Sequence, residues 1–175
     1  FNKMGELGFL GIKFPEEYGG LGLDYFSNVV FLEELARTAG GAALSILAHT
    51  DISATLVNLL GNHEQKQKYL TASITGEKIG ALGVTEANHG SDVAGIETKA
   101  IRDGNHYVVN GSKMYITNGT RADYVILGAK TQPELGHKGI SLFIMDTDLP
   151  GYRISKKLDK VGNRASDTAE LSFED

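Results

Sequence analysis

Two short segments carry residue types that could bind a planar heterocycle and a phosphate. Residues 84–92 read Val-Thr-Glu-Ala-Asn-His-Gly-Ser-Asp, and residues 113–119 read Lys-Met-Tyr-Ile-Thr-Asn-Gly. In each segment a stretch typical of a strand reaches a threonine that is followed by small or turn-forming residues. Such ends expose hydroxyls and backbone N–H groups, which can donate to the edge of a ring or to phosphate oxygens.

The first segment combines a ring-edge donor with a phosphate contact. The hydroxyl of Thr85 and the free backbone groups beside it match a ring edge that alternates donors and acceptors. Ser91 follows Gly90, and glycine lets the main chain approach a phosphate closely. The alternative is an ordinary polar loop after a strand, and the segment alone does not exclude it.

The second segment offers a ring for stacking and another hydroxyl. Tyr115 can stack on a planar ligand. Thr117 can donate to a ring nitrogen or a carbonyl. The alternative is a strand with alternating residues that ends in an Asn-Gly turn.

Other chemistries are poorly supported. Residues 14–22 are rich in glycine, but Tyr25 stands where a dinucleotide-binding turn needs its last glycine, so we predict a structural loop between helices. No histidine pairs at a metal-binding spacing, and His49 is predicted to be a structural helix residue. No serine lies in a nucleophile elbow, and Glu33-Glu34 is predicted to be a solvated helix face.

Composition limits the function classes. The 175 residues are 41% hydrophobic and 22% charged, as in soluble globular proteins of one domain or two small ones. A net charge of -5 without a basic stripe argues against nucleic acid as the main partner. The absence of cysteine excludes disulfides. We expect no membrane span and no signal peptide. The sequence begins at Phe1 rather than at methionine, and we expect a fragment.

Helix signals dominate residues 1–78. Three helices are expected after the loop, each with a start or stop signal. The signals are, in chain order, Asp24 as a cap, Gly40-Gly41 as an interruption, Gly61 as a stop, Asn62 with Gln65 as a capping box, and Gly76 as a stop.

Strand periodicity dominates residues 79–175. Asp103-Gly104-Asn105 and Asn110-Gly111 are hairpin signals between strands. The fold class is therefore α+β, with a helical module at 1–78 and a small antiparallel β-barrel or sandwich at 79–175. The expected strands are 79–84, 97–101, 106–109, 113–116, 124–129, 140–145, 152–155 and 169–173.

In this order, the segments resemble the acyl-CoA dehydrogenase family along the whole chain. Residues 14–22 are similar to the loop before a long helix of its N-terminal domain, and residues 78–86 to the entry into its middle domain. Residues 139–144 and 164–175 resemble later strands, and the closing segment is most similar to the long-chain branch.

The resemblance implies FAD as the cofactor. It places Thr85 at the pyrimidine end of the flavin, Thr117 near the reactive ring nitrogen, and Ser91 near both the pyrophosphate and the acyl-CoA substrate. Two departures are Ala87-Asn88-His89-Gly90, where the family has Pro-Gly-Ala-Gly, and Tyr115, where it has tryptophan. The cofactor-binding residues implied are Leu82, Val84, Thr85, Gly90, Ser91, Tyr115, Ile116 and Thr117.

The activity implied is FAD-dependent α,β-dehydrogenation of an acyl-CoA thioester. The resemblance places the family's glutamate base in a C-terminal four-helix domain, which we expect to lie beyond Asp175. No residue here is therefore assigned as catalytic, and neither Glu86 nor Glu97 is a substitute. We expect the chain alone to bind flavin weakly and to be inactive.

The resemblance also implies partners and a location. These are electron-transfer flavoprotein, a homo-tetramer or homo-dimer, and the bacterial cytoplasm or the mitochondrial matrix. The alternatives are a relative similar to flavin monooxygenases or nitroalkane oxidases, and a non-catalytic module that binds CoA or flavin.

Overall fold

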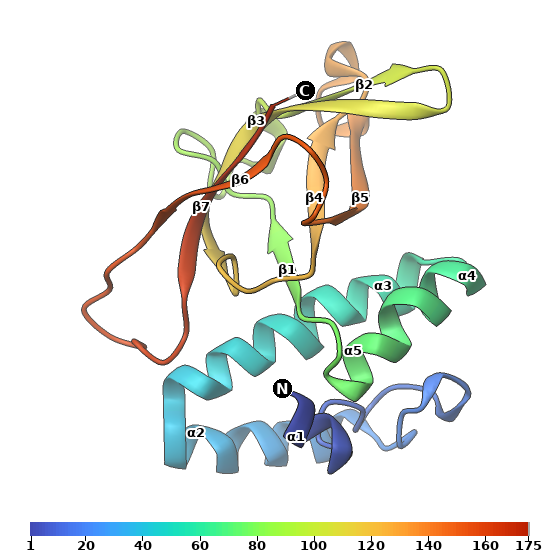
Figure 1. Ribbon diagram of the computed structural model, residues 1–175, viewed down its shortest axis with the longest axis vertical. Helices are drawn as coiled ribbons and strands as arrows, with labels where there is room; N and C mark the ends of the chain where they lie inside the picture. Colours follow the sequence, from blue (N-terminus) through green and yellow to red (C-terminus); the bar gives the residue numbers. More distant parts are fainter. Residues whose placement is uncertain (175) are drawn as a thin grey trace. The chain divides into compact units, whose positions relative to one another are not determined.

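The computed structural model describes residues 1–174, and its chain divides into two compact units. One unit comprises Phe1–Ala81 together with Asp159–Ser166, and the other comprises Leu82–Leu158 with the residues from Asp167 onward. Helices dominate the first unit and strands the second (Figure 1). The division at residues 78 and 79 stays a prediction, and the segment 159–166 groups with the helices.

Two helices of the helical unit begin at the caps that the sequence predicts. The Asp24 side chain accepts a hydrogen bond of 2.9 Å from the Ser27 N–H. Asn62 and Gln65 form the predicted capping box, with bonds of 2.8 and 2.9 Å. The helices are α1 (Asn2–Glu6), η1 (Glu16–Tyr18), α2 (Tyr25–Leu47), the π-helical η2 (Ala48–Ala54), α3 (Thr55–Leu60), α4 (His63–Gln65), the π-helical η3 (Lys66–Leu70) and α5 (Thr71–Thr75).

The predicted interruption of the long helix is a kink inside α2. Ala39, just before the glycine pair, has non-helical φ and ψ of -155° and 79°. A Cβ on Gly41 would lie 2.9 Å from the Cβ of Ala165, so glycine is needed there for close packing within the helical unit. The predicted second helix continues from α2 through η2 into α3 and stops before Gly61, as expected.

The run Tyr25–Leu60 is long and apolar enough to cross a membrane by length and composition alone. Half of its most apolar window is buried inside the protein, and core helices of soluble proteins meet the same criterion. The run also buries polar groups with partners, since Asp51 accepts from Lys13 at 2.7 Å and from Asn28 at 2.8 Å. This arrangement is typical of a core helix.

His49 has the structural role that the sequence predicts. It is fully buried in η2. The Gly80 N–H donates to its Nδ1 at 3.0 Å, so Nε2 carries the proton and donates to the Ser73 carbonyl at 3.0 Å.

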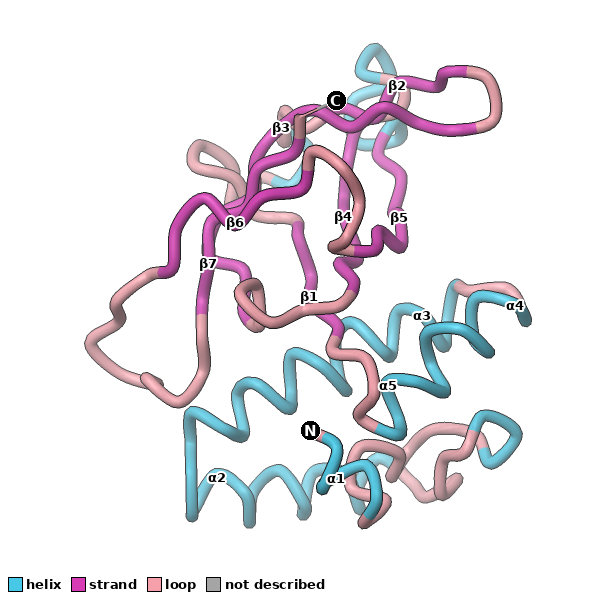
Figure 2. The backbone as a smooth tube through the Cα atoms, in the orientation of Figure 1, coloured by secondary structure: helices cyan, strands magenta, loops and turns pink. Residues whose placement is uncertain are grey.

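The β unit is a curled mixed sheet in the order β1-β4-β2-β3-β7-β6, with β5 beside β4 (Figure 2). β2 and β4 pair in parallel at Lys99 and Lys130, whereas the ladders β2–β3, β3–β7, β4–β5 and β6–β7 are antiparallel. The expected helix-then-strand architecture is confirmed, with a half-barrel as its β part. The elements are β1 (Gly80–Gly83), η4 (Val93–Gly95), β2 (Lys99–Asp103), β3 (His106–Thr117), β4 (Tyr124–Lys130), η5 (Pro133–Gly139), β5 (Ile140–Asp146), β6 (Tyr152–Lys157) and β7 (Thr168–Phe173).

The hairpin predicted at Asn110-Gly111 is wrong, because β3 runs through it as one strand. Its first half pairs with β2 up to Asn110, and its second half pairs with β7 from Gly111 onward. Gly111 has φ +150°, and a Cβ there would lie 2.5 Å from the Thr98 hydroxyl oxygen. The glycine therefore lets one strand pass from one ladder to the next. The other predicted hairpin, with Gly104 in its turn, is confirmed.

We predict that Gly111→Ala lowers the free energy of unfolding by at least about 2 kcal/mol, because it combines a strained φ with overpacking. Chemical denaturation measures the loss. Gly162→Ala is the control, since a Cβ there meets nothing within 4 Å. An equal effect of both substitutions would contradict the crossover role of Gly111.

Candidate functional site

The structure brings the first predicted segment beside the second. The Met114 N–H donates to the Thr85 carbonyl at 2.8 Å. The ammonium of Lys113 donates to the Val84 carbonyl at 3.0 Å. The main chain that follows β1 therefore runs against the middle of β3, and Thr117 ends the same strand.

A buried ion pair joins the two segments. Glu86 and Lys113 are 7% and 1% exposed, and the ammonium donates to Glu86 Oε1 at 2.8 Å. The same carboxylate accepts the N–H groups of Glu97 at 2.5 Å and Thr98 at 2.9 Å. The Glu86 side chain thus connects the first segment, to which it belongs, with β3 and with the residues that lead into β2. Neither partner is assigned this structural role from sequence, because a strand pattern does not reveal which lysine is buried.

The environment keeps Glu86 ionised. Burial raises its pKa, but hydrogen bonds from Lys113, Thr98 and Glu97 outweigh burial and lower the pKa to about 2. Burial lowers the pKa of Lys113, and Glu86 opposes that shift. A carboxylate with so low a pKa is a poor proton acceptor near neutral pH.

The loop after Glu86 is closed by its own main chain. The Glu86 N–H donates to the His89 carbonyl at 2.9 Å, and the His89 N–H donates back at 3.3 Å. The His89 ring lies between carboxylates, with Nδ1 3.7 Å from Asp92 and Nε2 3.9 Å from Glu97. Residues 86–89 therefore form a tight turn.

Gly90 and Ser91 are exposed beyond this turn. A Cβ on Gly90 would meet nothing within 4 Å, so the packing of this chain does not require glycine there. That face of the loop is free of protein atoms and is accessible to a ligand.

Tyr115 is held in a strained conformation at a bulge. Its φ is +61°, and the pairing of β3 with β7 shifts register between Lys113 and Ile116. The left-handed region costs a bulky residue about 1–2 kcal/mol, and such strain clusters at functional sites. The bulge leaves Tyr115 63% exposed and Ile116 only 2% exposed. Tyr115 can therefore stack on a ligand, whereas Ile116 could reach one only through its main chain.

The exposed groups fit a flat ligand with a polar edge. Accessible hydroxyls and main-chain N–H groups can donate to the edge of such a ligand, and a tyrosine ring can stack on its face. By exposure, Gly90, Ser91 and Tyr115 are open to solvent, Leu82, Val84, Thr85 and Thr117 are half-buried, and Ile116 is buried.

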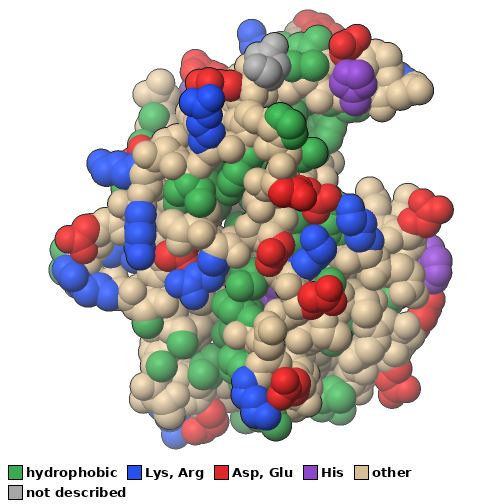
Figure 3. Space-filling view, viewed as in Figure 1, with side chains coloured by type: hydrophobic (Ala, Val, Ile, Leu, Met, Phe, Trp, Pro, Cys, Tyr) green, Lys and Arg blue, Asp and Glu red, His purple; other side chains and the backbone are tan. Residues whose placement is uncertain are grey.

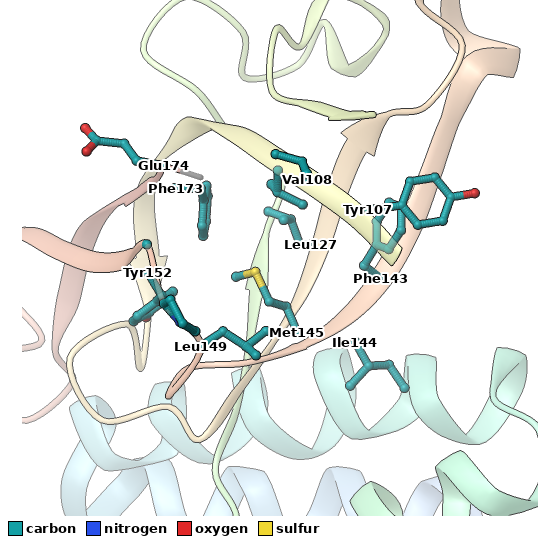
Figure 4. Close-up of a pocket in the computed structure, with 13 residues that line it drawn as sticks. Tyr107, Val108, Leu127, Phe143, Ile144, Met145, Leu149, Tyr152, Phe173 and Glu174 are labelled. Carbon is teal, nitrogen blue, oxygen red and sulfur yellow. The ribbon is translucent and has the colours of Figure 1, made fainter. Parts of the chain in front are cut away.

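Two cavities of the β unit are lined by other residues. One, of about 390 Å³, is apolar and includes Tyr107, Phe143, Met145 and Phe173 (Figure 4). A polar one, of about 230 Å³, lies beside Glu86 and is completed by Ala87, Asn88, Glu97, Thr98, Gly111 and Ser112. Neither is lined by any of the eight residues implied for the cofactor.

Charge does not point to a different kind of site. Acidic and basic side chains are interspersed on the face shown in Figure 3. Within residues 1–174, no group of three or more histidines and carboxylates is placed to hold a metal ion.

Comparison with known proteins decides the family. The model of the acyl-CoA dehydrogenase middle domain matches residues 81–175, and that of the N-terminal domain matches residues 1–77. The chain belongs to the acyl-CoA dehydrogenase family. The short-chain-specific acyl-CoA dehydrogenase of Clostridium acetobutylicum is 48% identical, over 99% of this chain and 46% of the relative. The chain thus spans about half the length of the curated relatives it matches.

Solved structures agree closely. A chain in a structure of the electron transferring flavoprotein of Acidaminococcus fermentans is 45% identical, with a TM-score of 0.97 over 99% of this chain and 46% of its own length. An acyl-CoA dehydrogenase complexed with FAD from Bacillus anthracis is 41% identical, with a TM-score of 0.92 over 99% of this chain and 29% of its own length.

We predict that Glu86→Gln lowers the free energy of unfolding by about 3 kcal/mol, because it leaves the ammonium of Lys113 buried without a counter-charge. The folded-state pKa of Glu86 lies below its ordinary 4.5, so the carboxylate's contribution is complete above pH 4.5 and is lost as the pH falls through about 2. Denaturation between pH 7 and pH 2 should show a weaker acid dependence in the variant.

Glu97→Gln is the matched control for that experiment, since its side chain is 73% exposed. It should change stability by no more than about 0.5 kcal/mol. If Glu86→Gln behaved the same way, the ion pair would not be the stabilising contact described here.

Tyr115→Gly should keep or raise stability by up to about 1 kcal/mol, because glycine relieves the left-handed strain. Little packing is lost, since the side chain is mostly exposed. Thermal unfolding measures the change. Tyr107→Gly, at a site without positive φ in the same sheet, should destabilise instead. A large loss of stability in Tyr115→Gly would show that the tyrosine serves packing rather than ligand binding.

Proposed function

We propose that this chain supplies the flavin cradle of an enzyme that dehydrogenates an acyl-CoA thioester between Cα and Cβ, with FAD as cofactor. The observation that carries the proposal is the pairing of the two motif segments, fixed by Glu86 and Lys113, in a chain of the acyl-CoA dehydrogenase family. Relatives named as acyl-CoA dehydrogenases, one of them with FAD bound, support the assignment.

The residues of the cradle hold and orient the cofactor. Thr85 and Thr117 donate hydroxyl hydrogens to the polar edges of the ring, and Tyr115 stacks beside it. Ser91, in the open loop at Gly90, donates to the pyrophosphate and lies near the acyl-CoA. Leu82 and Val84 line the apolar side. Ile116 contributes main chain only, because its side chain is in the core.

FAD, when bound, supplies the hydride acceptor. The proton at Cα needs a separate base, and Glu86 is a poor one, because hydrogen bonds from Lys113, Thr98 and Glu97 outweigh burial and lower its pKa to about 2. We place that base in sequence beyond residue 175. The electrons pass to electron-transfer flavoprotein, and the similarity to a chain in the structure of the Acidaminococcus fermentans electron transferring flavoprotein supports this route. A dimer or tetramer completes the enzyme, in the bacterial cytoplasm or the mitochondrial matrix.

Titrating the full-length protein with FAD tests the proposed function. We expect stoichiometric binding, seen in the visible flavin spectrum, and bleaching of that spectrum by an acyl-CoA without oxygen. The 175-residue chain alone should bind more weakly and should not bleach. FAD binding without bleaching by any acyl-CoA would favour the oxygen-using relatives, and no FAD binding would contradict the proposal.

Gly90→Ala tests the phosphate loop separately. The folded protein has room for the methyl group, so stability should stay within about 0.5 kcal/mol. The added methyl should obstruct the pyrophosphate and weaken FAD binding by about tenfold. Gly162→Ala is equally unobstructed and should leave FAD affinity unchanged. Equal affinities of the two variants would exclude close approach of a ligand at Gly90.

A further inference from the structure

Asp167 is a buried carboxylate just before β7, beside the end of β3 where Thr117 lies. It is 4% exposed and directly precedes β7. Thr168, the next residue, pairs with Thr117 across the β3–β7 ladder. Asp167 therefore faces the turn that leaves β3 immediately after Thr117.

Its contacts hold that turn at several points. Oδ2 accepts hydrogen bonds from both the N–H and the hydroxyl of Thr120, each at 2.7 Å. The Nε of Arg121 lies 2.7 Å from Oδ1. The Asp167 carbonyl accepts the N–H of Asn118 at 3.3 Å. Hydrogen bonds to a charged acceptor are the stronger kind, so this single residue sets the path of residues 118–121.

The turn would not be expected to keep this shape unaided. Asn118 is fully buried with φ +64°, in the left-handed region. Its carbonyl accepts the N–H groups of Arg121 at 3.0 Å and Ala122 at 2.9 Å. Such a conformation persists when the surrounding contacts determine it, and Asp167 supplies one of these contacts by accepting the Asn118 N–H.

Tyr152 lies close enough to the Asp167 carboxylate for its pKa to be affected. Burial first, and then the carboxylate of Asp167, raises the pKa of Tyr152 to about 12. The Tyr152 hydroxyl donates to the Gly119 carbonyl at 3.4 Å, inside the same turn. The turn is thus held by one buried anion and one neutral phenol.

We propose that Asp167 is a positioning residue of the flavin site, which fixes the direction of the Thr117 hydroxyl by holding residues 118–121. The inference rests on the proposed function, in which Thr117 donates to the flavin. Asp167 does not touch the cofactor itself. Its effect passes through Thr117, because a hydrogen bond to a ring atom weakens steeply when the donor moves or turns.

A double-mutant cycle between Asp167→Ala and Thr117→Val tests this coupling. The dissociation constant of FAD is measured for each variant of the full-length protein. Each single substitution should weaken binding by about tenfold. The double variant should be hardly weaker than either, since the hydroxyl is already misplaced without Asp167. Independent roles would instead multiply to about a hundredfold, and that result would overturn the proposal.

Two conservative changes separate positioning from general support of the fold. Asp167→Asn keeps an acceptor for Thr120 and should restore FAD affinity to within about threefold of the unmodified protein. Arg121→Gln removes the ion pair but no hydrogen bond of Thr120, and should change affinity by less than about twofold. If Asp167→Ala, Asp167→Asn and Arg121→Gln each weakened FAD binding in proportion to the loss of melting temperature, Asp167 would have a structural role only.

Thr120→Val covers the case in which Asp167→Ala does not fold. It removes one hydrogen bond to Asp167 and should weaken FAD binding by about threefold, an effect that disappears when Thr117 is already valine. Persistence of the effect in that background would overturn the proposal. Failure of the unmodified protein to bind FAD would overturn the proposed function as well. Binding with an additive cycle would overturn the role of Asp167 alone.

Discussion

The buried ion pair of Glu86 and Lys113 is the contact on which the rest of the candidate site depends. It is hydrogen-bonded on both sides, since Glu86 also accepts two main-chain N–H groups and Lys113 also donates to a carbonyl. A buried pair is weak evidence for stability in itself, because desolvation offsets much of the attraction. Its value here is geometric, because it fixes the position of residues 84–92 relative to residues 113–119.

The site concentrates features that do not maximise stability. Tyr115 has a positive φ on an exposed side chain, and Gly90 lies in a loop with unfilled space beside it. Gly111 has a φ that other residues rarely adopt, and it carries β3 from one ladder to the other. Strain is retained where function outweighs its cost. Two of the described non-glycine residues with positive φ, Tyr115 and Asn118, lie in the second of the two segments that the sequence marks.

Local signals made most of the fold predictable. The cap at Asp24 and the capping box at Asn62 each depend on residues three apart, so a short stretch of sequence contains all the information. The Asn110-Gly111 hairpin failed because the same dipeptide suits both a tight turn and a strand that changes partners. Only the distant strand β7 distinguishes them. The two motif segments were found from sequence for the same local reason.

The parts of the site that sequence reasoning missed are its buried charges. Nothing in the pattern around Lys113 marks it as buried, because an alternating strand can present lysine to water on either face. Burial depends on Glu86, twenty-seven residues away. Asp167 was missed similarly, since its partners Thr120 and Arg121 are more than forty positions distant.

The carboxylates of Glu86 and Asp167 have similar surroundings. Each is buried, each accepts at least one main-chain N–H, and each lies near a cation, Lys113 for Glu86 and Arg121 for Asp167. For Glu86, hydrogen bonds from Lys113, Thr98 and Glu97 outweigh burial and lower the pKa to about 2, which makes it a weak base near neutral pH, whereas the contacts of Asp167 hold the turn after β3. A base that removes a proton next to a thioester carbonyl needs the opposite environment, with a pKa closer to the working pH. Among the described residues, the buried acids beside the candidate site are thus suited to hold strands and turns in place. In the proposed enzyme, Glu86 and Asp167 would therefore serve the geometry of the cofactor site rather than the proton transfer.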